Sequence, residues 1–246
     1  MIIGSNRLFY DKLPSTNTLA ASLLNNEDIE EGTVIHTNFQ TAGRGQKNNI
    51  WESEKSKNLL FSVILYPDKV LPAEQFYISM AVSIGICDFI DRYFPGSKIK
   101  WPNDIYINDD KIAGILIENS IRGEIIESTI TGIGFNINQE EFAVTTPKPV
   151  SLKILTGKEF DTLTCLDQML SDLDERYKQL LYGDRELIRS GYIKRLYRFN
   201  EWHEFRASGA IFRGKITNIS SYGNLMLMME DGLISEFSFK EIEYLI

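Results

Sequence analysis

The chain has 246 residues, with 26 Lys and Arg against 34 Asp and Glu, which gives a formal net charge of −8. This length favours one large domain, or a main domain with a small appendage, and it supports a hydrophobic core without disulfides or a structural metal. The negative balance argues against a protein that mainly coats nucleic acid or anionic membrane, so any basic cluster must be local.

Composition and apolar run lengths bear on where the protein resides. Hydrophobic residues make up 43% of the chain and charged residues 24%, as in an ordinary globular protein. The apolar stretches at residues 59–66 and 113–117 are far shorter than the roughly 20 residues of a membrane span. The N-terminus lacks the basic and apolar regions of a signal peptide. We therefore expect a cytoplasmic protein that does not contact membranes.

The first predicted elements alternate helix and strand. Residues 14–24 carry cap-forming polar residues before an apolar stripe, which predicts a helix that begins directly after a loop. β-branched runs predict strands at residues 33–39 and 59–65. The Gly/Asn-rich basic segment at residues 41–49 between them is predicted to be a long polar loop. Pro72 then opens a predicted core helix that ends near residues 94–96.

The middle of the chain predicts a meander followed by two helices. Three or four short strands are expected between residues 98 and 138, with turns at residues 108–110 and 122–123. Apolar stripes at helical spacing then predict amphipathic helices at residues 163–182 and 185–199.

The pattern changes after Asn200. From Trp202 onward the chain predicts four short strands, including a hairpin at residues 231–232. A segment of about 45 residues cannot build much core alone, so it is expected to dock on the rest. We predict an α+β fold with helices packed against a mixed, largely antiparallel sheet. The predicted division is a main domain at 1–199 and a small all-β domain at 200–246.

The polar loop at residues 40–51 is the most informative segment. Gly43 and Gly45 allow close approach of the backbone, and Arg44 and Lys47 place two cations beside backbone amides, a composition suited to holding a phosphate. The segment does not follow the Walker pattern. A solvated basic surface loop is the alternative interpretation.

Further polar motifs follow along the chain. Residues 100–104 combine a cation, an aromatic ring, a proline, an amide and a carboxylate at a strand junction. If the following strands form a hairpin, Lys111 returns to the neighbourhood of Asp104. A solubilising lysine after an acidic turn is the alternative for Lys111. Two glycines and two amides at residues 131–138 are also explained by a close-packed strand bulge.

Taken together and in this order, these segments resemble the biotin protein ligase family. The resemblance covers roughly residues 8–140 by motif. At residue 46 and residues 48–49 the chain has Gln and Asn where many relatives have Arg and Gly. The matching motifs are Ser-Thr-Asn at 15–17, a Gly-Arg-Gly loop ending in Trp at 43–51, Lys-Trp-Pro-Asn-Asp at 100–104, Lys with Gly-x-Leu-x-Glu at 111–118, and Gly-x-Gly-x-Asn-x-Asn at 132–138.

The resemblance implies both a fold and an activity. The fold is a class II synthetase-like catalytic domain followed by a small SH3-like domain. The activity is ATP-dependent conversion of biotin to biotinyl-5′-AMP with Mg²⁺, and transfer of biotin to a lysine of a biotin carboxyl carrier protein domain. Only 14 residues precede Ser15, too few for a helix-turn-helix domain, so we expect a monofunctional ligase that does not bind DNA. A homodimer is possible.

The resemblance also implies roles for individual residues. Fixed positive charge lets the biotin carboxylate attack an anionic phosphate, so Arg44 and Lys111 are predicted catalytic residues. Asp104 is the third predicted catalytic residue, as a partner for the incoming lysine amine. Neutral hydrogen-bonding groups suit the ureido head of biotin. The predicted biotin contacts are Ser15, Thr16, Asn17, Gln40, Arg44, Gly45, Gln46, Lys111 and Gly114. The predicted ATP contacts are Arg44, Lys47, Trp51, Asn103 and Asn136, and the predicted Mg²⁺ ligands are Asp104 and Asn136.

Two alternative functions are kept. A lipoate or octanoate ligase or transferase has the same overall fold, and fold alone does not fix the acyl substrate. The combined Gly-Arg-Gly loop and Lys-Trp-Pro-Asn-Asp block favour biotin over these. A catalytically inactive carrier-docking module is the second alternative, although Arg44, Asp104 and Lys111 are all present.

Overall fold

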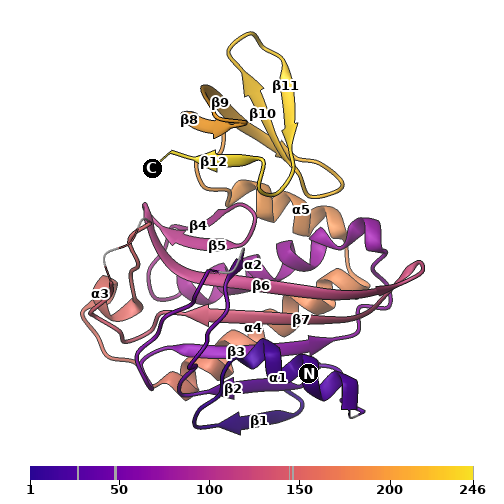
Figure 1. Ribbon diagram of the computed structural model, residues 1–246, viewed down its shortest axis with the longest axis vertical. Helices are drawn as coiled ribbons and strands as arrows, with labels where there is room; N and C mark the ends of the chain where they lie inside the picture. The colour runs from indigo at the N-terminus through magenta and orange to yellow at the C-terminus, as the bar shows by residue number, and fades with distance from the viewer. Residues whose placement is uncertain (27, 47–48, 144, 146, 246) are drawn as a thin grey trace.

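The computed structural model describes residues 1–26, 28–46, 49–143, 145 and 147–245. Its main layer is a seven-stranded sheet in the order β1-β2-β3-β7-β6-β5-β4 (Figure 1). The β1–β2 pair is parallel, and every other neighbouring pair in this sheet is antiparallel. The strands are β1 (Arg7–Tyr10), β2 (Val34–Thr37), β3 (Leu59–Leu65), β4 (Ser97–Lys100), β5 (Asp104–Ile107), β6 (Asp110–Arg122) and β7 (Ile125–Phe135).

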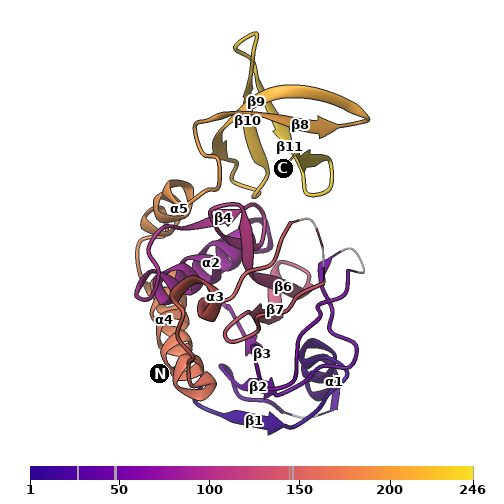
Figure 2. The same ribbon diagram turned by 90° about the vertical axis from the view of Figure 1, so that its left-hand side faces the viewer.

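Strand β3 is buried along all seven residues because both faces of the sheet are covered. Alternate side chains of a strand point to opposite faces. Phe61 and Val63 accordingly join the large core, whereas Ile64 joins a smaller cluster under helix α1 (Thr16–Asn26). Figure 2 shows α1 and helix α4 (Thr162–Tyr182) on opposite sides of the sheet.

The large core is built around helix α2 (Phe76–Asp91), in which twelve of sixteen residues are buried. Helices α4 and α5 (Arg185–Lys194) pack against it. In the described part of the chain, the segment Pro72–Asp91 alone is a helical stretch long and apolar enough to cross a membrane, but 61% of its apolar window is buried inside the fold. These contacts are those of a core helix.

A second, antiparallel sheet follows α5, in the order β11-β10-β9-β8-β12. It lies at one end of the main layer, beyond α5 and the β4–β5 hairpin (Figure 1). Trp101 Nε1 donates a buried hydrogen bond to Gly223 O at 2.8 Å, and Arg189 donates one to Ile219 O at 2.6 Å. The strands are β8 (Trp202–Ala207), β9 (Ala210–Ile219), β10 (Leu225–Met229), β11 (Ile234–Phe237) and β12 (Ile242–Tyr244).

The predicted fold class is confirmed: the molecule is α+β, with a mixed, largely antiparallel sheet and a C-terminal β sheet. Several details of the prediction were wrong. The second sheet has five strands rather than four, and the short strand β1 and short helix α3 (Leu152–Thr156) were not expected. Strands β6 and β7 are long because they pair with each other almost from end to end.

Two predicted helices have different bounds. The helix expected from Pro72 is a 3-10 turn at Pro72–Glu74 followed by α2, which ends at Asp91. The last helix ends at Lys194 rather than at residue 199. Arg198 and Asn200 adopt positive φ angles of 59° and 61°, which cannot continue a right-handed helix.

Candidate functional site

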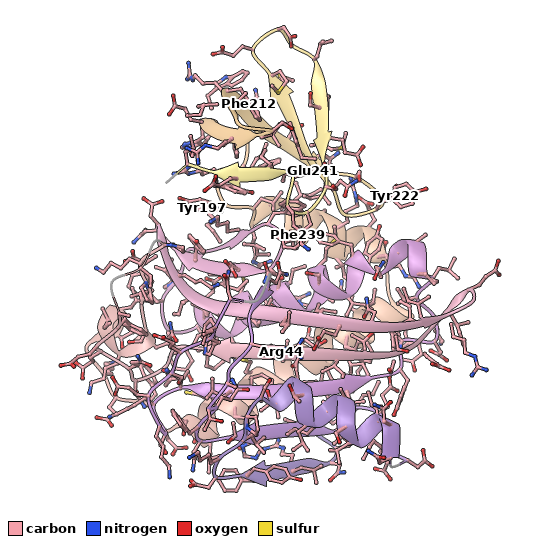
Figure 3. All side chains as sticks on the ribbon, in the orientation of Figure 1. Arg44, Tyr197, Phe212, Tyr222, Phe239 and Glu241 are labelled. Carbon is pink, nitrogen blue, oxygen red and sulfur yellow. The ribbon has the colours of Figure 1, made fainter. Side chains whose placement is uncertain are left out.

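A cavity of about 540 Å³ lies between the start of α1, the loop at residues 40–51, the central strands of the main sheet and the C-terminal segment. Figure 3 shows Arg44 in front of the main sheet and Phe239 at the junction with the second sheet. The residues of the main layer that line the cavity include Thr16, Asn17, Gln40, Arg44, Gly45, Gln46, Trp51, Lys100, Asn103, Asp104, Lys111, Gly114, Gly132 and Gly134.

The neutral end of the cavity is formed by the first turn of α1. Gln40 Oε1 accepts a hydrogen bond from Thr16 N at 2.8 Å, which ties the helix start to the loop. Asn17 Oδ1 accepts from Ser62 Oγ at 2.6 Å. A Cβ atom at Gly132 would overlap Asn17 Oδ1, so this strand position admits only glycine beneath the amide. Buried polar groups here are satisfied by one another and held in fixed orientations.

The loop carries Arg44 to the edge of this neutral region. Trp51 N donates to Gly43 O at 3.0 Å, so the two arms of the loop lie side by side. Arg44 Nη2 pairs with Glu118 Oε1 at 2.6 Å while Arg44 still lines the cavity. Lys47, a predicted ATP contact, lies outside the described residues.

Trp51 forms an apolar wall directly on the main sheet. A Cβ atom at Gly134 would overlap the indole, and one at Gly114 would lie 3.0 Å from Trp51 Cζ3. Lys111 Nζ lies 5.6 Å from the centre of the Trp51 ring, within the range of a cation–π interaction. The indole therefore separates the sheet from the loop and contacts the charged end of the cavity.

The charged end is assembled by the strands β4, β5 and β6. Lys111 Nζ pairs with Asp104 Oδ1 at 2.7 Å, as the hairpin interpretation predicted. Asn103 Nδ2 donates to Ile115 O at 2.6 Å and braces the β4–β5 turn. Burial lowers the pKa of the Lys100 ammonium, and the charge of nearby Asp104 opposes this shift. The cavity thus has fixed cations at one end and neutral groups at the other.

Two of the predicted site residues do not line the cavity. Ser15 is buried at the start of α1. Asn136 is buried too, and its Nδ2 donates to Val150 O at 3.1 Å, so it does not stand beside Asp104 in the lining. Among the described residues, no group of three or more His, Cys, Asp or Glu side chains is placed to hold a metal ion. Of the two predicted Mg²⁺ ligands, the structure places Asp104 in the cavity lining and Asn136 outside it.

Sequence reasoning missed several contributors. Ser62 is fully buried and touches both Thr16 and Asn17; the only signal was a lone polar residue in the apolar run at residues 59–65. Glu118 ends a recognised motif, but no role followed from its position. The C-terminal contributors carry no motif, and they are Phe239, Lys240, Ile242, Glu243, Tyr244 and Leu245.

Comparison with known proteins confirms the family resemblance. Residues 9–136 match the model of the biotin/lipoate A/B protein ligase family. The bifunctional ligase/repressor BirA of Bacillus subtilis (strain 168) is 30% identical over 243 residues, which cover 96% of this chain and 74% of that protein. The biotin–[acetyl-CoA-carboxylase] ligase of Paracoccus denitrificans is 30% identical over 198 residues, covering 76% of this chain and 80% of that protein.

A solved structure agrees with the fold. Biotin protein ligase from Aquifex aeolicus, in complex with biotin and ATP, superposes with a TM-score of 0.81 at 24% identity, and the match covers 97% of this chain and 98% of that one. The family model, the relatives and the shared fold lead to one conclusion: the chain belongs to the biotin/lipoate A/B protein ligase family.

Proposed function

We propose that this protein is a biotin protein ligase. It uses ATP to convert biotin to biotinyl-5′-AMP and then passes the biotinyl group to a lysine of a carrier protein. The observation that carries this proposal is one cavity in which a neutral, hydrogen-bonding end meets a wall of tryptophan and an end with fixed cations. The ligase names of the relatives support the same activity.

The neutral end suits the ureido head and apolar chain of biotin. Thr16, Asn17 and Gln40 supply uncharged donors and acceptors, and Trp51 supplies apolar surface beside them. A pocket for a mostly apolar ligand needs a few fixed polar groups of this kind. We assign these four residues to the binding of biotin, with Gly45, Gln46 and Gly114 completing the walls.

The cationic end suits the activation step. An oxygen of the biotin carboxylate attacks the α-phosphorus of ATP, forming the acyl–phosphate bond as the α–β bridging bond breaks and pyrophosphate leaves. Arg44 and Lys111 would neutralise the two anions that must approach each other. Arginine can hold an anhydride through two N–H groups, and lysine acts as a point charge. Asn103 is assigned to the nucleotide, and Trp51, which lies beside Lys111 as well as the neutral end, is assigned to both substrates.

In the transfer step, the amine of the acceptor lysine attacks the biotinyl carbonyl, the carbonyl–phosphate bond breaks, and AMP leaves. Asp104 lines the cavity beside Lys111 and is assigned to take the proton from that amine. Asn136 is not assigned to ATP or to a metal because its side chain is held outside the cavity. Asp104 lines the cavity and is the residue that would hold Mg²⁺ together with ATP phosphates, where the ion would neutralise part of their charge.

The acceptor and the compartment are also proposals. A biotin carboxyl carrier protein domain is the proposed acceptor; the Paracoccus relative is named for ligating biotin to acetyl-CoA carboxylase. We place the reaction in the cytoplasm. The protein could act there as a monomer or as a homodimer. The net charge of −8 supports protein and small-molecule substrates rather than DNA.

Parallel assays of ATP–pyrophosphate exchange test the proposal. Exchange should depend on biotin, and purified carrier domain should then become biotinylated on one lysine. Exchange with lipoate or octanoate but not with biotin would replace biotin ligation by ligation of those acids. Absence of exchange with all three acids would favour the carrier-docking module.

A further inference from the structure

Glu118 lies on β6 just outside the cavity lining, yet its carboxylate contacts two residues of the site. Its Oε2 accepts a hydrogen bond from Asn17 Nδ2 at 2.8 Å. Its Oε1 accepts one from Arg44 Nη2 at 2.6 Å, and Arg44 Nη1 lies 3.4 Å from Oε2. One carboxylate therefore joins the first turn of α1 to the loop that carries Arg44.

These contacts belong to a longer chain of hydrogen bonds. Thr16 Oγ1 lies 3.2 Å from Gln40 Oε1 and 2.7 Å from Ser62 Oγ, and Ser62 reaches Asn17 at 2.6 Å. Asn17 and Glu118 continue the chain to Arg44. Polar groups linked in this way hold one another's orientation, and the loss of one member affects its neighbours.

The amide of Asn17 is oriented from both sides. Its Oδ1 faces Ser62, and its Nδ2 donates to Glu118 and, at 3.2 Å, to Leu116 O. Glu118 is the charged acceptor in this set, and hydrogen bonds to ionised groups are stronger than those between neutral groups. Without Glu118, the amide keeps a single neutral acceptor for its Nδ2.

The contacts with Glu118 hold the guanidinium of Arg44 but leave some of its N–H donors available for another partner. An arginine has five N–H donors, and the contacts with Glu118 involve only the two terminal nitrogens. Arg44 lines the cavity while it is paired. It can thus contact Glu118 and a bound anion at the same time.

We propose that Glu118 is a positioning residue that sets Asn17 and Arg44 relative to each other through one carboxylate. The proposal rests on the proposed function, in which Asn17 contacts biotin and Arg44 contacts the reacting phosphate. Biotin recognition and the activation step then share one fixed point on β6. The competing account is an ordinary surface ion pair: the side chain of Glu118 is 36% exposed and that of Arg44 47% exposed, and such pairs often contribute little.

The test measures biotin-dependent pyrophosphate exchange in the full chain, beginning with the unsubstituted protein. Glu118→Gln keeps a neutral acceptor for Asn17 and removes the charge that faces Arg44. We expect its KM for biotin to stay within about twofold and its kcat to fall by about tenfold, the size of a lost charged hydrogen bond. Glu118→Ala removes both contacts, so its KM should also rise, by about tenfold.

A matched control lies on the adjacent strand. Glu127 on β7 contacts Arg122 at 3.3 Å and Ser120 at 3.4 Å, away from the cavity lining. Glu127→Gln makes the same chemical change and should leave both kinetic constants at their original values. If Glu118→Gln and Glu118→Ala behave like this control, the positioning role is overturned while the proposed function stands.

A double-mutant cycle with Arg44→Ala tests the coupling even where Glu118→Ala folds poorly. If Glu118 acts on kcat through Arg44, Glu118→Gln should change kcat by less than about twofold in the Arg44→Ala background. A full tenfold effect in that background would overturn the proposal. If the unsubstituted protein shows no exchange with biotin, the proposed function fails, and this inference fails with it.

Discussion

The two sheets contribute to the cavity in different ways. Around the main sheet, polar residues of the site contact one another: Lys111 pairs with Asp104, and Asn17 on α1 accepts a hydrogen bond from Ser62 on β3. The second sheet contributes a strand end and the segment before it, and aromatic rings join them to the main layer: the centre of the Tyr244 ring lies 5.2 Å from Lys100 Nζ, and Phe239 packs against Trp101. The hydrogen-bonded polar groups of the site therefore come from the main layer, whereas the second sheet adds side chains whose position depends on its docking.

The largest effect is expected from the main sheet. Lys111→Ala should lower adenylate formation by about a hundredfold or more, because a preorganised cation is lost where two anions meet. Pyrophosphate exchange with saturating biotin measures this. Lys55, an exposed residue paired with Asp11 at 2.7 Å, provides the control, and Lys55→Ala should keep full exchange. Near-normal exchange by Lys111→Ala would remove Lys111 from the mechanism.

A smaller effect is expected where the sheet meets Trp51. Gly134→Ala places a methyl group in the space of the indole, and overpacking of this kind costs about 1–3 kcal/mol. The KM for biotin should rise by about tenfold. Gly191→Ala on α5 is the control, since its Cβ would lie at an ordinary 3.5 Å from Ile84 Cδ1. Equal KM values for the two variants would show that Trp51 does not shape the biotin site.

The docking of the second sheet is tested by Trp101→Phe, which removes the buried hydrogen bond to Gly223 O. The loss should cost about 1 kcal/mol and lower Tm by roughly 2–4 °C for a chain of this size. Trp202→Phe changes a partly exposed tryptophan of the second sheet and serves as the comparison in thermal unfolding. The same Tm in both variants would mean that the hydrogen bond does not help to hold the second sheet.

The smallest effect is on the pH dependence of stability and comes from two buried thiols, Cys87 on α2 and Cys165 on α4. Burial raises the pKa of Cys87 to about 12 and that of Cys165 to about 11, from a reference of 9.0. Because the native thiols keep their protons longer than the unfolded ones, their contribution to stability is complete below pH 9 and is lost as pH rises through the native pKa values.

Thiol labelling follows from the same shifts. At pH 8 both cysteines should resist an aromatic disulfide reagent in the native protein and react once it is unfolded. They should stay protected in Trp101→Phe, because phenylalanine keeps an aromatic ring in the core that Trp101 shares with both cysteines. Rapid labelling of the native protein would contradict the burial of the two thiols.

The parts of the site that could be predicted are those in which the functional residues follow one another in a short sequence motif. The motifs at residues 15–17 and 100–104 were placed in the cavity region by their composition and family resemblance, and the hairpin brought Lys111 to Asp104. Ser62 and Glu118 join Asn17 only because β3, β7 and β6 are neighbours in the sheet. Local pattern contains no information about that order.

The same limit applies to the fold. The long periodic helix α4 was predicted within one residue of its bounds, and α2 was predicted in the right place but begins and ends inside the expected range. Strand β1 has four residues with alternating exposure at the sheet edge, too short a run to distinguish from a loop. Helix α5 ends at Lys194, and residues 195–199 include no glycine or proline that would mark this end in the sequence.

Gly132 and Gly134 lie two residues apart on β7, and Gly114 is the cross-strand partner of Gly134 on β6. Two residues apart on a strand means the same face of the sheet, so this face carries a strip from which no side chain rises. Because glycine has no side chain, this strip of the sheet leaves space above its backbone. A side chain added in this strip would displace Asn17 or Trp51, so the absence of three side chains is what lets the amide and the indole lie directly on the sheet and form the floor of the cavity.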